Sequence, residues 1–183
     1  PHCDYESARG DQCDNCGRTL DSKELKNPHP KLNPDAEIEF RETEHLFFKL
    51  SAFRDTLLEW LSSGKEHWRP SVINFTRNWL QEGLIDRPIT RDLEWGIDIE
   101  REGYEKKRMY VWFEAVMGYY SASLHWAKNQ GKPDLWKEWW ESEDAEHYYF
   151  MAKDNIPFHT IIWPAMLSGC GLHLPHDVPA NEY

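Results

Sequence analysis

The sequence predicts an α/β fold in which a parallel sheet carries helices, preceded by a cysteine-containing segment and an α+β region. Two observations predict the sheet. An aromatic and β-branched stretch over 108–113 changes to a helical pattern at Glu114, and a similar stretch over 145–152 leads into a helix that ends near Ser168. Two strand–turn–helix units in series are typical of parallel sheets, which bind ligands beyond the carboxyl ends of their strands.

The cysteine segment predicts a metal site. Cys3, Cys13 and Cys16 follow the spacing Cys-x9-Cys-x2-Cys, and Pro1-His2-Cys3 resembles the tail of a Cys-Pro-x-Cys turn. With a Cys before Pro1 there would be two Cys-x-x-Cys turns, a pattern typical of a structural Zn²⁺. Two alternatives remain open: a weakly held or absent metal, and an oxidised pair with one free thiol. Cys170, between two glycines, is expected at a helix end.

Loop, strand and helix signals follow in that order. Leu20 to Asp35 reads as loop, and Glu37 to Leu50 as extended strands. Ser51 is expected to cap a helix that ends near Ser62, and Gly64 to close it. The apolar side of this helix consists of Phe53, Leu57, Leu58 and Leu61. A second helix should run from Pro70 to Gln81, with Gly83 closing it. Its inward-facing residues are expected to be Val72, Phe75, Trp79 and Leu80.

The first strand–turn–helix unit carries a candidate binding face. Its helix should end near Asn129, where Gly131 can adopt the left-handed conformation that closes a helix. Trp112, Ala115 and Tyr119 are three and four residues apart and so point the same way. Two rings beside one small residue suggest a slot for a thin apolar side chain. The alternative is the ordinary apolar face of an α/β helix.

The second unit contributes a turn and a helix at the same predicted sheet edge. Pro157 suits a first helical turn, and Asp154 or Asn155 could cap it. Pro164 lacks an amide hydrogen and should kink the helix. Residues 132–142 include a short helix expected as an outer cover, and 176–183 should form a further strand.

The two units also resemble a known family. Tyr-Val-Trp-Phe-Glu-Ala-Val-Met-Gly-Tyr (110–119) and Lys-Asp-Asn-Ile-Pro-Phe-His-Thr-Ile-Ile-Trp-Pro-Ala-Met-Leu (153–167) resemble the methionyl-tRNA synthetases, which are class I aminoacyl-tRNA synthetases. The likeness covers essentially the whole chain. It implies that residues 91–183 are the second half of a Rossmann-like nucleotide-binding domain. It also implies that residues 1–90 are a connective insert, with a zinc knuckle in 1–20, strands and two helices.

The resemblance further implies site residues. Those matching the methionine pocket are Trp112, Ala115, Tyr119, Phe158 and His159, with Arg91 bracing the amino-acid site. The turn Lys153-Asp154-Asn155 matches the ATP-ribose contact, with Asp154 as the contacting carboxylate. Asp98 is a candidate adenosine contact, and a solvated loop carboxylate is the alternative.

The implied reaction joins L-methionine to tRNA(Met) in two steps, with ATP and Mg²⁺ in the first. Within these residues there is no His-x-Gly-His motif and no Lys/Ser loop, which hold the phosphates in class I enzymes. We therefore expect no catalytic residue in this chain and no activity from it alone. Two alternatives remain: a class I synthetase for another aliphatic amino acid, such as leucine or valine, and a non-catalytic zinc-knuckle binding domain.

Charge and hydropathy limit the possible partners. The formal charge is 21 − 32 = −11, which disfavours general nucleic-acid binding because phosphate contacts need clustered Lys and Arg. Any tRNA contact must be local or lie outside this chain. The sequence has no apolar run of the roughly 18–20 residues that span a bilayer and no secretory signal, so we expect a cytoplasmic protein.

Overall fold

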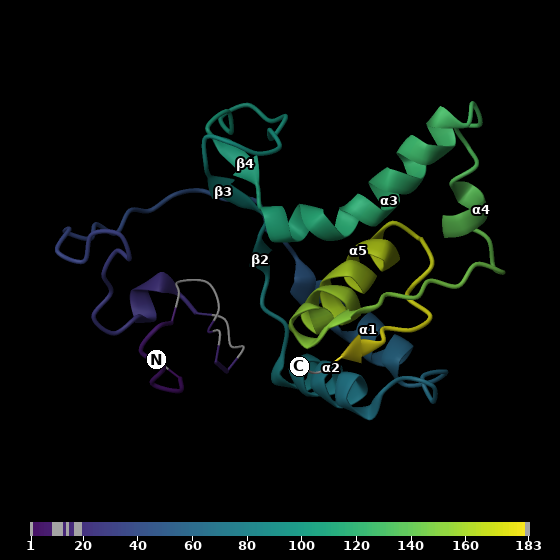
Figure 1. Cartoon of the computed structure of the whole chain (residues 1–183), viewed down its shortest axis with the longest axis horizontal. Helices are drawn as coiled ribbons and strands as arrows, with labels where there is room; N and C mark the ends of the chain where they lie inside the picture. The colour runs from purple at the N-terminus through teal and green to yellow at the C-terminus, as the bar shows by residue number, and fades with distance from the viewer. Residues whose placement is uncertain (1, 9–12, 14, 17–19, 182–183) are drawn as a thin grey trace. The chain divides into compact units, whose positions relative to one another are not determined.

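The computed structural model describes residues 2–8, 13, 15–16 and 20–181 (Figure 1). The chain divides into two compact units, Pro1–Glu44 and His45–Tyr183. In the first, the 3₁₀ turn η1 (Ser22–Glu24) lies within the segment expected as loop. Among the described residues, every helix is too short or too polar to span a bilayer.

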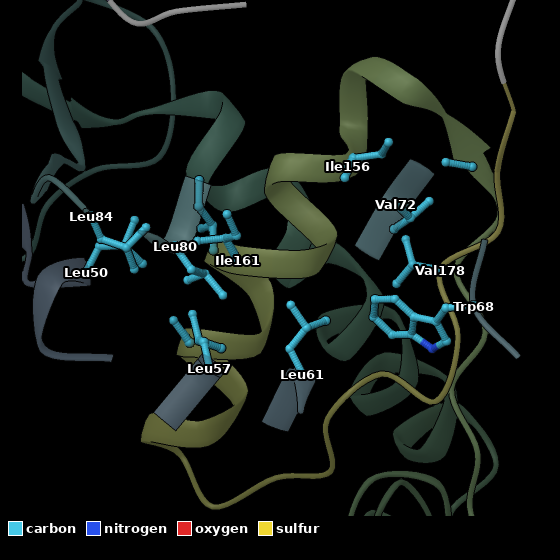
Figure 2. Close-up of a cluster of buried hydrophobic side chains, with 13 residues drawn as sticks. Leu50, Leu57, Leu61, Trp68, Val72, Leu80, Leu84, Ile156, Ile161 and Val178 are labelled. Atoms are coloured by element: carbon cyan, nitrogen blue, oxygen red, sulfur yellow. The ribbon is translucent and has the colours of Figure 1, made fainter. Parts of the chain in front are cut away.

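The core of the second unit is built largely from two helices and the C-terminal part of the chain. Helix α1 (Arg54–Leu61) follows the 3₁₀ turn η2 (Leu50–Phe53), and α2 (Pro70–Glu82) begins at its proline as expected. Figure 2 shows leucines of α1 and α2 converging with Ile161 and Val178. Leu57, Leu80 and Ile161 are each fully buried. The apolar spacing of both helices therefore predicted their buried faces, apart from Phe75, which is exposed.

The segment that follows strand β5 (Met151–Ala152) combines three kinds of helical turn. After the 3₁₀ turn η3 (Lys153–Asn155), η4 (Phe158–Ile162) is a π-helical turn and α5 (Trp163–Gly169) is an α-helix. Pro164 supplies no amide hydrogen to the carbonyl of Thr160, so regular α-helical bonding is interrupted at the position the sequence indicated. Cys170 caps α5, as expected.

The strands form three separate two-stranded sheets. β1 (Phe47–Phe48) pairs antiparallel with β2 (Arg87–Pro88), and β3 (Thr90–Asp92) pairs antiparallel with β4 (Lys107–Met109). β5 (Met151–Ala152) pairs in parallel with β6 (Ala180–Asn181), which confirms a strand near the C-terminus. The fold is α/β, but β4 and β5 do not share the single parallel sheet that we expected.

Helix α3 (Val111–Asn129) begins three residues earlier than predicted, so Trp112 lies in its first turn and not on a strand. The carbonyl of Tyr110 accepts hydrogen bonds from the amides of Phe113 and Glu114 and starts the helix. Local bonding thus overrides the β-propensity of this stretch. Gly131 has φ of 69°, as expected for the residue that closes the helix. Helix α4 (Lys137–Trp140) follows.

Three further expectations differ from the structure. Residues 37–44 form no strand, and Phe40 is exposed, so the alternating pattern there has no buried face to satisfy. Residues 145–150 are likewise outside the named strands, although Tyr148 bridges Asp177 in parallel. Ser51 does not cap a helix by its side chain: it lies in η2, and its amide donates to the Asp86 carboxylate at 3.0 Å.

We predict that Leu80→Ala lowers the free energy of unfolding by about 2–5 kcal/mol, because it leaves a cavity in the core. Ile85→Ala is the matched control, since Ile85 is 67% exposed, and should change it by less than about 0.5 kcal/mol. Urea denaturation of the two variants and the wild type measures both values. Equal losses would contradict the placement of Leu80.

Candidate functional site: an aromatic cluster on α3 and η4

Helices α3 and η4 bring together four of the aromatic residues that the sequence singled out. The rings of Trp112 and Phe158 lie 5.9 Å apart between centroids, tilted by 33°. The rings of Tyr119 and His159 lie 5.7 Å apart, and their polar atoms are bonded. Because Trp112 and Tyr119 are two helical turns apart on α3, the two pairs lie along the same side of this helix. We call these four residues the aromatic cluster.

Two hydrogen bonds fix the orientation and the tautomer of the His159 ring. The Asn155 carbonyl lies 2.9 Å from His159 Nδ1, and the Tyr119 hydroxyl lies 2.9 Å from His159 Nε2. A carbonyl can only accept, so Nδ1 carries the proton and Nε2 accepts one from Tyr119. Burial lowers the pKa of His159, which keeps the imidazole neutral and this arrangement intact.

The outer side of the cluster is open. Trp112 is 52% and Tyr119 45% exposed, whereas His159 is buried. Ala115 is also exposed and lies between the two rings on α3. At the position of the slot predicted from the sequence, the structure therefore has two exposed rings on α3 with a small exposed residue between them. Such a surface can bind and orient an apolar side chain.

Two buried residues behind the cluster were missed from the sequence. Tyr149 touches the rings of Tyr119 and His159, and its hydroxyl accepts a hydrogen bond from the Trp163 indole at 2.9 Å. Trp163 could have been noticed, since it lies four residues after His159 on the same helical face. Tyr149 lies in a stretch whose aromatic residues look alike in sequence, so no local signal distinguishes it.

Arg91 lies on β3 and braces the start of α3. Its guanidinium carbon lies 3.8 Å from the centre of the Tyr110 ring, and its Nη1 donates to the carbonyls of Pro88 and Thr90. Tyr110 is the residue from which α3 starts, two positions before Trp112. Arg91 thus touches the element that carries the cluster.

Asp98 lies in the segment between β3 and β4. Its carboxylate is 3.2 Å from the Arg108 guanidinium, and the two residues form an isolated antiparallel bridge. Within the part of the chain that the structure describes, this ion pair is the side-chain contact seen for Asp98. Asp98, the candidate adenosine contact, is therefore ion-paired with Arg108.

The turn predicted to meet ATP is η3. Lys153 and Asp154 are exposed on it, while the backbone carbonyl of Asn155 holds His159. The same three-residue turn therefore presents two charged side chains to solvent and supports the aromatic cluster from its other side.

The cysteine cluster lies in the first compact unit. The Sγ atoms of Cys3, Cys13 and Cys16 all lie within 4.8 Å of one another, and Cys13 is buried. Hydrogen bonds from the Asn15 side chain and the Tyr5 backbone lower the pKa of Cys3 to about 7, which favours the thiolate that binds metals. The predicted metal-ligating residues are thus brought together.

Comparison with known proteins identifies the class. The sequence profile of the family described as tRNA synthetases class I (M) matches residues 1–183. The chain belongs to this family of class I tRNA synthetases, as its two motifs indicated.

The similar proteins share one name. The methionine–tRNA ligase of Dehalococcoides mccartyi is 60% identical over 184 residues, covering 100% of this chain and 33% of that protein. That of Thermoplasma volcanium is 55% identical over 184 residues, covering 100% and 34%. The predicted resemblance to methionyl-tRNA synthetases is confirmed, and the chain spans about a third of the length of the curated relatives it matches.

A solved structure supports the fold. The methionyl-tRNA synthetase of Mycobacterium tuberculosis bound by methionyl-adenylate matches with a TM-score of 0.64 and 26% identity, over 90% of this chain and 32% of that one. Its free form matches with a TM-score of 0.58 and 29% identity, over 75% and 26%. The class I synthetase fold is therefore confirmed.

We predict that acid destabilises the chain partly through His159. Its folded-state pKa is lowered, so the unfolded chain takes up this proton first. The contribution of neutral His159 to the free energy of unfolding is complete above the unfolded-state pKa of about 6.5. It is lost as the pH falls through the folded-state pKa. His159→Gln should therefore flatten the decline in unfolding free energy between about pH 7 and pH 5.

Urea denaturation at several pH values measures this slope. His125→Gln is the control, because His125 is exposed on α3, and it should keep the wild-type slope. The same slope in the His159 variant would contradict the assignment. Burial also lowers the pKa of His45, so His45 adds to the same decline in unfolding free energy. Its contribution is present in every variant and does not affect the comparison.

Proposed function

We propose that this chain is a segment of a methionine–tRNA ligase that supplies most of the methionine pocket and part of the ATP site. The observation that carries the proposal is the aromatic cluster, in which Trp112 pairs with Phe158 and Tyr119 pairs with His159 along one side of α3. The relatives named above are methionine–tRNA ligases over their whole length, of which this chain matches one part.

Methionine suits such a face for physical reasons. Its unbranched thioether is polarizable, and contact of sulfur with aromatic rings is favourable by about 0.3–1.5 kcal/mol. Ala115 leaves room for the thin side chain between Trp112 and Tyr119. An apolar site distinguishes near-isosteres by only about 1–3 kcal/mol, so close analogues such as norleucine should also bind.

The first step joins methionine to AMP. One oxygen of the methionine carboxylate attacks the α-phosphorus of ATP, a P–O bond forms, and pyrophosphate leaves with the electron pair of the broken P–O bond. Such chemistry depends on positioning and on stabilising phosphate charge. We assign the methionine side chain to the aromatic cluster, with Arg91 bracing the amino-acid site. We assign the ATP ribose to Asp154, with Lys153 and Asn155 beside it and Asp98 near the adenosine.

The second step moves the methionyl group to the terminal ribose of tRNA(Met). The phosphate-holding groups, with their Mg²⁺, and the tRNA contacts are assigned to other parts of the whole protein, which we place in the cytoplasm. The chain alone is therefore inactive. In this proposal residues 91–183 belong to the catalytic nucleotide-binding domain and residues 1–90 to the connective insert.

We also propose that Cys3, Cys13 and Cys16 hold a structural Zn²⁺. Three sulfurs within 4.8 Å of one another fit three corners of a tetrahedral site. His2 lines the same hollow, and a further cysteine from the whole protein is the better-matched fourth ligand. The ion would tie the first compact unit together, since structural zinc contributes directly to folding.

For the methionine site, we predict that Trp112→Ala in the whole protein raises the KM for methionine at least about tenfold, with the KM for ATP changed less than about twofold. The reason is that Trp112 supplies one wall of the slot and no ATP contact. Methionine-dependent exchange of pyrophosphate into ATP measures both constants, with leucine as the control amino acid. Trp126→Ala is the matched variant, because Trp126 is an exposed tryptophan on the same helix. Equal effects on both substrates would remove Trp112 from the methionine site.

For the metal site, we predict that Co²⁺ added to the reduced chain produces thiolate-to-cobalt charge-transfer absorption, because three thiolates bind one ion. Cys16→Ser should weaken Co²⁺ binding at least about tenfold, while Cys170→Ser should leave it unchanged, since Cys170 lies at the end of α5. Absorption titration measures both. An equal loss in the two variants, or no absorption in the wild type, would contradict the site.

A further inference from the structure

Tyr149 is a buried residue that contacts both the aromatic cluster and Trp163 behind it. It is 8% exposed and lies just before β5. Its ring contacts Tyr119 at 5.2 Å and His159 at 5.5 Å between centroids. These two residues are also joined by the 2.9 Å hydrogen bond between the Tyr119 hydroxyl and His159 Nε2. Tyr149 therefore packs against both ends of the bond that orients the cluster.

Two attachments hold Tyr149 in place. Its amide donates to the Asp177 carbonyl at 3.0 Å, next to the parallel bridge between Tyr148 and Asp177. Its hydroxyl accepts from Nε1 of Trp163, which is 3% exposed. Because one attachment is to the segment leading to β6 and the other is to α5, the side chain cannot change its χ1 rotamer without breaking a buried hydrogen bond.

The ring beside Tyr149 needs such support. Tyr119 is 45% exposed, and a half-exposed tyrosine would be free to change rotamer if one side of its ring lost contact. His159 is fixed on one side by the Asn155 carbonyl. Tyr149 closes the other side of the pair. Burial raises the pKa of Tyr149 to about 12, so its hydroxyl stays neutral at ordinary pH.

We propose that Tyr149 is a positioning residue for amino-acid recognition: through its bond to Trp163 it holds Tyr119 and His159 in the orientation that receives the methionine side chain. This inference rests on the proposed function. Tyr149 itself does not touch the substrate. We expect its effect to fall mainly on the amino-acid side of the site, because its ring packs against Tyr119 and His159, which both belong to the aromatic cluster.

Two substitutions separate the hydroxyl from the ring. Tyr149→Phe keeps the ring contacts but leaves the Trp163 indole without its acceptor, and should raise the KM for methionine by about fivefold. Tyr149→Leu removes the ring as well and should raise it by about 30-fold, since small displacements of positioning groups have large effects. The KM for ATP should stay within about twofold of wild type in both.

Tyr120→Phe is the matched control. Tyr120 is the next residue on α3, and its ring contacts Trp136 and Trp140. Removal of its hydroxyl should leave both KM values unchanged. If Tyr149→Leu does not fold, the comparison of Tyr149→Phe with Tyr120→Phe carries the test.

A double-mutant cycle tests the route through Trp163. Trp163→Phe removes the donor of the same hydrogen bond, so the Tyr149→Phe/Trp163→Phe double variant should raise the KM for methionine no more than the larger single effect. Additive effects would overturn the role of this bond. A methionine KM unchanged in Tyr149→Phe, or equal effects on methionine and ATP, would overturn the positioning role.

The assay is methionine-dependent pyrophosphate exchange in the whole protein. A wild-type protein without this activity would contradict the proposed function, whatever the Tyr149 variants do. An active wild type with unaffected Tyr149 variants would contradict only the present inference. The two failures are thus distinguishable.

Discussion

The helical segment from Phe158 to Gly169 packs against two separate apolar clusters, and this double burial positions the candidate site. Ile161 and Ala165 lie in the core formed with α1 and α2, whereas Trp163 and Leu167 lie in a second cluster with Val116 of α3. A segment held on two sides cannot rotate about its own axis without exposing large apolar surface. Phe158 and His159, at its start, are therefore presented to α3 at a fixed angle.

The π-helical turn at Phe158–Ile162 matters for the same reason. A π turn shifts the side chains that follow it around the helix axis relative to an α-helix. Here the turn contains His159, which faces Tyr119, and leads directly into the α5 residues that face the core. The buried hydrogen bond between Thr76 of α2 and Thr160 at 2.9 Å ties this turn to the core. Backbone irregularities of this kind are common at functional sites.

Buried polar groups behind the exposed rings are hydrogen-bonded to one another. The chain of bonds from Asn155 through His159 to Tyr119 uses both ring nitrogens of a buried histidine. The hydrogen bond from Trp163 to the Tyr149 hydroxyl likewise gives the single N–H of a buried indole a partner. Leaving such groups unpaired costs about 1–3 kcal/mol each, so these bonds stabilise one arrangement of the rings over others. The orientation of the exposed rings therefore depends on buried groups behind them.

Local pattern was enough to identify much of this arrangement. The apolar spacing of α1 and α2, the proline that begins α2 and the glycine that closes α3 all act within a few residues, so the sequence predicted them. The spacing of Trp112 and Tyr119 likewise placed both on one face of α3. For η3, local signals offered Asp154 or Asn155 as a helix cap at the predicted sheet edge, and the family motif added the expected contact with the ATP ribose.

The sequence by itself determined the helices, the residues of the aromatic cluster and the family, because periodicity, caps and motifs are properties of neighbouring residues. Only the tertiary structure decided where α3 begins, that the strands form three short pairs, and that Tyr149 and Trp163 lie behind the cluster. Those features depend on contacts between residues far apart in the chain. Strand pairing and buried hydrogen bonds are selected by the partners that folding brings together, and no single stretch of sequence specifies them.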